Sequence, residues 1–104
     1  MEFTGNENHS ITLTEASNLT KNYREKAETG AIVGAYFGKS TFLKILDQEG
    51  CVGIRYYFGQ KDDGTPEMIL VGVDANGNDL EKGEIAERQY PCPPNCGENN
   101  ELNS

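Results

Sequence analysis

Two apolar segments joined by a polar turn constrain the fold of this 104-residue chain more than any other feature. Residues 51–58 and 67–73 are both rich in β-branched and aromatic side chains, which favour strands. Residues 61–64 (Lys-Asp-Asp-Gly) lie between them, and Gly64 can adopt the positive φ of a tight turn. The pattern predicts an antiparallel hairpin.

The loop length sets which residues of this hairpin face each other. A four-residue loop over 61–64 pairs Gln60 with Thr65. One face then forms the core, onto which the helices pack, with Val52, Ile54, Tyr56, Phe58, Ile69, Val71 and Val73. The other face pairs Gly53 with Gly72, Arg55 with Leu70 and Tyr57 with Met68. Two facing glycines would leave a shallow trough, conditional on this register.

Helical periodicity appears twice before the hairpin. Residues 14–29 carry one apolar stripe, preceded by a capping box of Thr12 and Glu15 and followed by Gly30. A second, shorter helix is predicted from a Ser40 cap to Gly50, with Phe42, Ile45 and Leu46 on its inner face.

Turn signals continue after the hairpin. Asn76-Gly77 predicts a type I′ turn with a short strand near 78–81, and residues 85–90 predict a last edge strand. We expect a disordered lead over 1–9, a single domain over 10–90 and a proline-rich polar tail over 91–104. The predicted fold class is α+β, with two helices packed on one face of a small antiparallel sheet of three to four strands.

The charge of the chain is −8 and unevenly distributed. Residues 1–61 hold seven acids and seven bases, whereas residues 62–104 hold ten acids and two bases. Nucleic acids and anionic membranes are polyanions and would be repelled, so we expect neither as a partner. The acids fall largely in the predicted turns and edge segments, where charge keeps a small sheet from pairing with its neighbours.

Targeting signals are not evident. No apolar run approaches the roughly 20 residues of a membrane span. The first residues are acidic and polar, unlike a signal peptide. We therefore expect a cytoplasmic protein, of bacterial type.

Two motifs resemble ligand loops without completing them. Residues 34–40 place Gly-Lys-Ser before a helix, but only three residues separate the glycines where a phosphate loop needs four. Residues 74–79 resemble the start of a calcium loop, yet position six is Asp79 and position twelve is Ile85. We interpret the first as a bend before a helix and the second as a hairpin turn.

Cys92 and Cys96 flank two prolines in a segment similar to a zinc knuckle with one residue too many. Cys51 and His9 could complete a set of three cysteines and one histidine, although Cys51 fits a core position better. Three states stay open for Cys92 and Cys96: free thiols, which we favour, a metal site or a disulfide.

Arg55 is the other candidate, because a cation in mid-strand needs a partner. It could form a salt bridge, stack on Tyr57, or anchor an anionic ligand or a partner's acidic side chain on the face with Gly53 and Gly72. No pairing of nucleophile and base suggests an enzyme, and no cofactor is expected. We predict a small non-catalytic interaction or assembly module that binds a protein partner or itself. The alternative is a metal- or small-ligand-binding protein that uses the Cys92/Cys96 loop or the Arg55 face.

Overall fold

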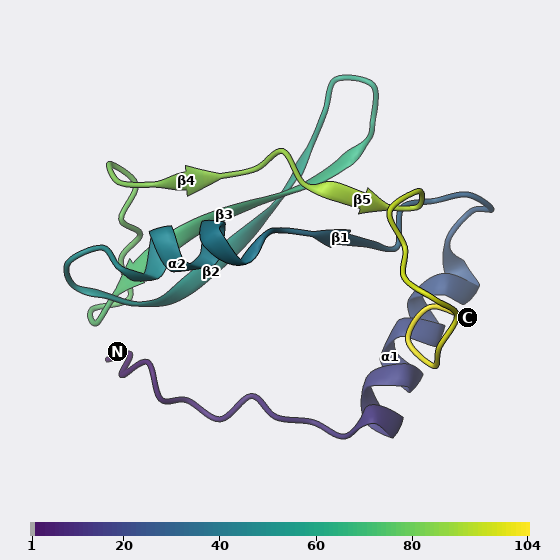
Figure 1. The fold of residues 1–104 in the computed structure, drawn as a ribbon, viewed down its shortest axis with the longest axis horizontal. Coiled ribbons are helices and arrows are strands. Elements are labelled where there is room, and N and C mark those ends of the chain that lie inside the picture. The colour runs from purple at the N-terminus through teal and green to yellow at the C-terminus, as the bar shows by residue number, and fades with distance from the viewer. Residues whose placement is uncertain (1) are drawn as a thin grey trace. The chain divides into compact units, whose positions relative to one another are not determined.

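The computed structural model describes residues 2–104. Along this part of the chain the elements are α1 (Leu13–Lys26), β1 (Gly34–Tyr36), α2 (Lys39–Leu46), β2 (Cys51–Gln60), β3 (Pro66–Asp74), β4 (Ile85–Ala86) and β5 (Tyr90–Cys92) (Figure 1). The predicted α+β class is confirmed. The strands form two antiparallel sheets instead of one, in the orders β2-β3-β4 and β1-β5.

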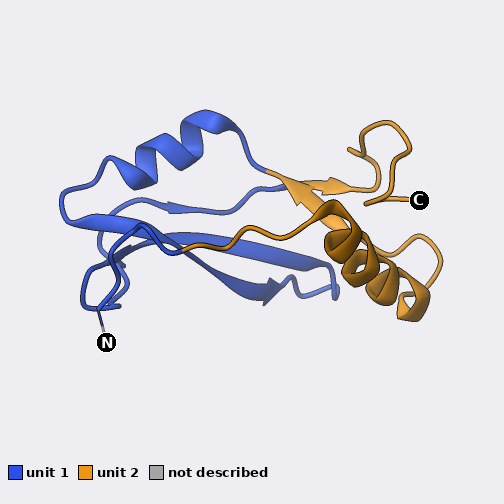
Figure 2. Cartoon of the chain, turned by 90° about the horizontal axis from the view of Figure 1, so that it is seen from below, with its two compact units in different colours: residues 1–7, 37–89 blue, residues 8–36, 90–104 orange. Residues whose placement is uncertain are grey.

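The described residues fall into two compact units (Figure 2). The first, here called the sheet unit, contains residues 37–89 and the N-terminal segment up to Glu7. The second, the disulfide unit, contains residues 8–36 and 90–104. Helix α2 packs on the three-stranded sheet, and α1 belongs to the disulfide unit. The division at residues 9 and 90 stays a prediction.

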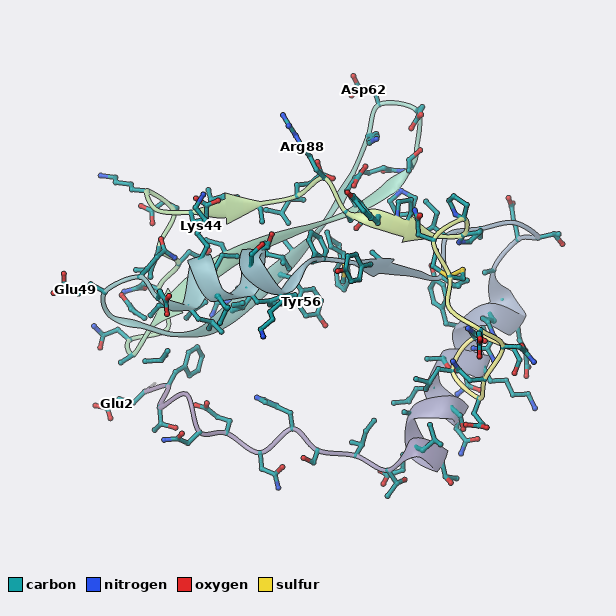
Figure 3. All side chains as sticks on the ribbon, viewed as in Figure 1. Glu2, Lys44, Glu49, Tyr56, Asp62 and Arg88 are labelled. Carbon is teal, nitrogen blue, oxygen red and sulfur yellow. A yellow bond between two sulfur atoms is a disulfide. The ribbon has the colours of Figure 1, made fainter. Side chains whose placement is uncertain are left out.

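The register of β2 and β3 differs by one residue from the predicted one. Gln60 pairs with Pro66 and not with Thr65, and Arg55 pairs with Val71. The loop is shorter than predicted, because the Lys61 N–H donates to the Thr65 carbonyl (2.8 Å) and leaves only residues 62–64 between them. Figure 3 labels Asp62 at the tip of this loop.

A glycine at the third loop position explains this geometry. Gly64 has φ of 93°, as in a three-residue hairpin loop whose last residue is left-handed. The turn after β3 has the same three-residue geometry. Asp74 N–H donates to the Asn78 carbonyl (2.9 Å), and Gly77, the third loop residue, has φ of 84°. Arg88 is the only non-glycine residue with a positive φ among the described residues. A type I′ turn requires a positive φ at both central residues, so Asn76 does not form the predicted type I′ turn.

The sheet unit contains the apolar core. Its buried hydrophobic residues are Ile45, Leu70, Val71 and Val73. Helix α2 lies close to β3 at Gly72, where an added Cβ atom would come within 2.9 Å of Gln48 Nε2 and 3.3 Å of Ile45 Cγ2. Gly72 therefore permits the close packing of helix on sheet.

Helix α2 differs from prediction at its start and on its inner face. Gly38, and not Ser40, is the N-cap, without a side-chain hydrogen bond. Of the predicted inner residues only Ile45 is buried, whereas Phe42 and Leu46 are exposed. Near the N-terminus, Phe3 N–H donates to the Ala75 carbonyl (2.8 Å).

The disulfide unit has a different construction. The predicted capping box of α1 is confirmed, with Glu15 N–H donating to Thr12 Oγ1 (3.1 Å). The helix ends at Lys26 with an extended Ala27 as its cap, so the predicted stop at Gly30 is three residues too late. No residue of α1 is buried.

Strands β1 and β5 join segments far apart in the sequence within this unit. Gly34 pairs with Cys92, and Tyr36 pairs with Tyr90, whose ring lies 5.8 Å from that of Tyr36. The predicted strand over 85–90 is therefore two short strands, β4 and β5, in different sheets. Within residues 2–104, none of the helices has the length and apolarity needed to cross a bilayer.

Candidate functional site

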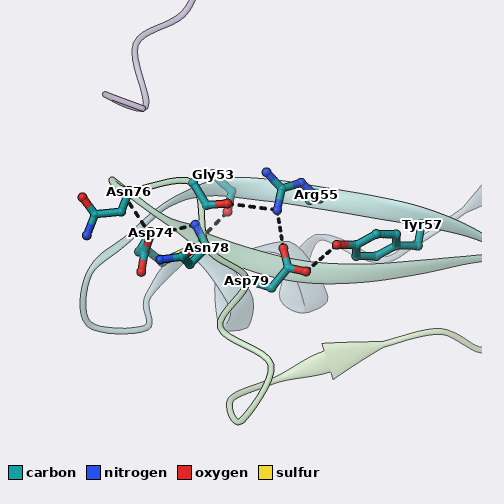
Figure 4. Close-up of polar contacts among 9 residues, drawn as sticks. Gly53, Arg55, Tyr57, Asp74, Asn76, Asn78 and Asp79 are labelled. Carbon is teal, nitrogen blue, oxygen red and sulfur yellow. Dashed lines mark hydrogen bonds and ion pairs between the residues drawn. The ribbon is translucent and has the colours of Figure 1, made fainter. Parts of the chain in front are cut away.

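Arg55 and Tyr57 both bind Asp79 on one face of the three-stranded sheet (Figure 4). Arg55 Nη1 donates to Asp79 Oδ1 (2.5 Å) and to the Gly77 carbonyl (3.2 Å). Tyr57 donates its hydroxyl proton to Asp79 Oδ2 (2.5 Å). Each carboxylate oxygen thus has its own donor, and the side chain of Arg55 is engaged within the chain.

The electrostatics of the three residues are mutually reinforcing. The Tyr57 hydroxyl and then the Arg55 guanidinium stabilise the carboxylate and lower the pKa of Asp79, although partial burial opposes them. The hydrogen bond to Asp79 raises the pKa of Tyr57 and that of Arg55. The arrangement is a stable ion pair with a phenol attached, which is the salt-bridge alternative weighed for Arg55.

The sequence prediction missed Asp79 as the partner of Arg55. The turn at 75–77 brings Asp79 back beside Val73, where the two form an isolated β-bridge. Val73 pairs with Gly53 on its other side, so Asp79 lies across β3 from the start of β2, where the side chains of Arg55 and Tyr57 reach it. The Asn76-Gly77 turn signal could have located Asp79, because Asp79 follows this turn by two residues.

The resemblance of residues 74–79 to a calcium loop is explained by the same turn. Asp74 Oδ1 accepts hydrogen bonds from the backbone N–H groups of Asn76 and Asn78, each at 2.9 Å. This carboxylate therefore stabilises the turn. No group of three or more metal-ligating side chains occurs within residues 2–104.

The predicted glycine trough is not formed. Gly53 pairs with Val73, whereas Gly72 pairs with Ile54 on the neighbouring position. Gly72 is buried beneath α2, so it does not share an open face with Arg55 and Tyr57. The predicted pairs of Arg55 with Leu70 and Tyr57 with Met68 were wrong for the same one-residue slip.

A second charged group lies nearer the hairpin loop. Glu67 is only 9% exposed, and Lys61 Nζ lies 3.2 Å from its Oε1. A hydrogen bond with Glu87, together with burial, raises the pKa of Glu67, and the same bond lowers the pKa of Glu87.

Cys92 and Cys96 form a disulfide, with their Cα atoms 4.8 Å apart. The favoured prediction of free thiols was therefore wrong, and both sulfurs that the metal alternative required are bonded to each other. Cys51 is a free, half-buried cysteine whose thiol donates to the Gly53 carbonyl (3.2 Å). It lies beside Gly72, as expected for a small core residue.

Large apolar side chains remain exposed on the sheet unit. Tyr56 and Phe58 are 52% and 84% exposed, and their rings meet edge to face with centroids 5.9 Å apart. Both lie on β2, the edge strand of the three-stranded sheet, and Figure 3 labels Tyr56 there. The sequence prediction placed both residues in the core, which is wrong.

No protein family, curated protein or solved structure matches this chain.

Proposed function

We propose that this chain is a small non-catalytic interaction or assembly module. The observation that carries the proposal is the imbalance of its apolar surface. Only four hydrophobic side chains of the described residues are buried, while fifteen large ones are exposed. Scattered exposed apolar residues are ordinary, but gathered ones mark surfaces that other proteins cover.

The exposed residues are concentrated on a few elements. Helix α1 exposes Leu13, Leu19 and Tyr23, and helix α2 exposes Phe42, Leu43 and Leu46. Strand β2 adds the paired rings of Tyr56 and Phe58. Aromatic and aliphatic side chains of this kind dominate the binding energy of protein interfaces.

The alternative of a ligand-binding protein has weaker support. The guanidinium of Arg55 is engaged by Asp79, and the Cys92–Cys96 disulfide occupies both candidate metal ligands. The charge of −8 supports protein over nucleic acid or membrane as the partner. The expected cytoplasmic location is the part of the proposal that the disulfide weighs against, because disulfides persist mainly in oxidising compartments.

Sedimentation velocity of the purified chain, combined with cross-linking and capture from its source cells, tests the proposal. We expect either concentration-dependent self-association or a partner that binds the purified chain saturably. A monomer across about 1 µM to about 1 mM, the range of moderate to weak affinities, with no saturable partner, would contradict the proposal.

A further inference from the structure

We propose that the outer edge of β2 pairs antiparallel with β2 of a second copy of this chain, so that two three-stranded sheets join into one. This inference rests on the proposed interaction function and names its surface and its partner. Strand addition at an open sheet edge gains affinity from main-chain hydrogen bonds and specificity from the alternate side chains.

From Ile54 to Gln60 the outer edge of β2 is not paired with any strand of the described residues, whereas at its start Gly5 packs against the Val52 carbonyl. The order β2-β3-β4 makes β2 an edge, and its ladder with β3 includes the Lys61–Thr65 hydrogen bond. Because bonded pairs alternate along an antiparallel ladder, odd-numbered residues of β2 bond β3 and even-numbered ones point outward. The outward set in the regular part of the strand is Ile54, Tyr56, Phe58 and Gln60.

Two further observations agree with this alternation. Pro66, which has no N–H, pairs with Gln60 at an outward position where no bond to β3 is required. On β3, the Gly72 carbonyl accepts from Leu80 N–H (2.8 Å) and so points away from β2. No strand of the described residues pairs with the outer edge of β2.

The edge is self-complementary about a two-fold axis at Tyr56. In that register Tyr56 faces its own copy, and Ile54 faces Phe58, so apolar side chains meet on one face. On the other face Arg55, the one charged residue of β2, lies opposite Tyr57 of the second copy. No like charges are therefore directly opposite within the paired strands.

The two edges of this sheet differ in protection. Strand β4 has only two residues, and very short edge strands resist pairing. Strand β2 has ten residues and contains neither lysine nor proline, and its irregularity is confined to residues 51–53. Its single charge is paired with Asp79 within the chain. The usual protection of an edge strand is thus missing where the apolar side chains are exposed.

Charge at the ends of the strand makes the association sensitive to salt. The symmetric register brings the acidic turn at 62–63 of each copy alongside Glu49 and Gly50 of the other. Raising the ionic strength from about 0.05 M to about 0.5 M screens this repulsion and should tighten the dimer.

The test is sedimentation equilibrium of the full chain and three variants. Tyr56→Lys places two lysines at the two-fold axis and should weaken dimerisation at least tenfold. Tyr36→Lys is the matched control, since it makes the same change at a similarly exposed tyrosine (58%) on β1, outside the three-stranded sheet, and it should dimerise like the parent. Phe58→Pro removes an outward N–H without breaking the ladder to β3, and should also weaken the dimer at least tenfold.

Circular dichroism of each variant establishes that it is folded, and Phe58→Pro carries the test if Tyr56→Lys does not fold. A dimer unaffected by both edge variants would overturn the β2 pairing while leaving the proposed interaction function intact. A strictly monomeric parent that binds a different protein would do the same. A strictly monomeric parent with no partner would overturn both.

Discussion

Different interactions stabilise the sheet unit and the disulfide unit, each within itself. The sheet unit buries Ile45, Leu70 and two valines between the hairpin and its neighbours. The disulfide unit has an α-helix without a single buried residue. A capping box, the Cys92–Cys96 disulfide and polar contacts stabilise this unit. Arg24 illustrates this, because its guanidinium donates to the backbone oxygens of Leu102 and Ser104.

In both units, folding leaves large apolar side chains exposed to water. In the sheet unit the apolar core is small, and the aromatic side chains of Tyr56 and Phe58 are exposed on the edge strand β2. In the disulfide unit the apolar stripe of α1 is exposed. Association is the physical means by which such surfaces leave water.

The largest expected effect is a cavity in the sheet unit. Ile45→Ala removes a fully buried side chain and should lower the free energy of unfolding by about 3 kcal/mol. The matched aliphatic truncation on α1, Leu19→Ala, should change it by less than about 0.5 kcal/mol, because Leu19 is exposed. Urea unfolding measures both, and equal losses would mean that the two units do not differ in this way.

Removing the disulfide should act on the other unit. Cys92→Ser with Cys96→Ser releases a short loop, and the loop-entropy relation gives a loss of about 2 kcal/mol. We expect amide exchange to accelerate in β1 and β5 while β2 and β3 stay protected. Faster exchange in both sheets would show that the units are coupled.

A smaller loss is expected at the start of α1. Thr12→Ala removes the acceptor for the Glu15 N–H and should cost about 1 kcal/mol of helix stability. Thr12→Ser keeps a hydroxyl and is the control. Chemical shifts of the first helical turn report the change, and identical shifts in Thr12→Ala and the parent would argue against a working cap.

The smallest expected effect is a titration. Tyr57→Phe removes the hydroxyl that contributes most to lowering the pKa of Asp79, so this pKa should rise towards its ordinary range. A lowered carboxyl pKa stabilises the fold above the unfolded value of about 4, and this contribution is lost as the pH falls through the folded pKa.

The variant should therefore lose less stability than the parent on acidification below about pH 4. Carboxyl-carbon NMR of Asp79 measures the shift directly. Tyr56→Phe, which alters a neighbouring tyrosine on the same strand, is the control. An Asp79 titration unchanged by Tyr57→Phe would show that the hydroxyl does not stabilise the carboxylate.

Local features of the fold could be predicted from the sequence. The capping box at Thr12 and the two strands of the hairpin depend on neighbouring residues, and both are confirmed. The register was missed by one residue, because Gly64 at the third loop position gives a three-residue loop where four were expected.

Features that depend on distant residues could not be predicted. Gly34 and Cys92 pair across most of the chain, and no local pattern indicates it. Asp79 reaches Arg55 only through the turn at 75–77 and the register of β3. The exposure of Tyr56 and Phe58 follows from the position of β2 at the sheet edge, which is a property of the topology.

The most direct measurement is residue-resolved amide hydrogen exchange along β2 at low and high protein concentration. Pairing of β2 with a second copy predicts that the N–H groups of Ile54, Tyr56 and Phe58 become protected as concentration rises. Those of Arg55 and Tyr57, which bond β3, should be protected throughout. Exchange at Tyr56 and Phe58 that is the same at both concentrations, fast or slow, would contradict the pairing of two β2 strands.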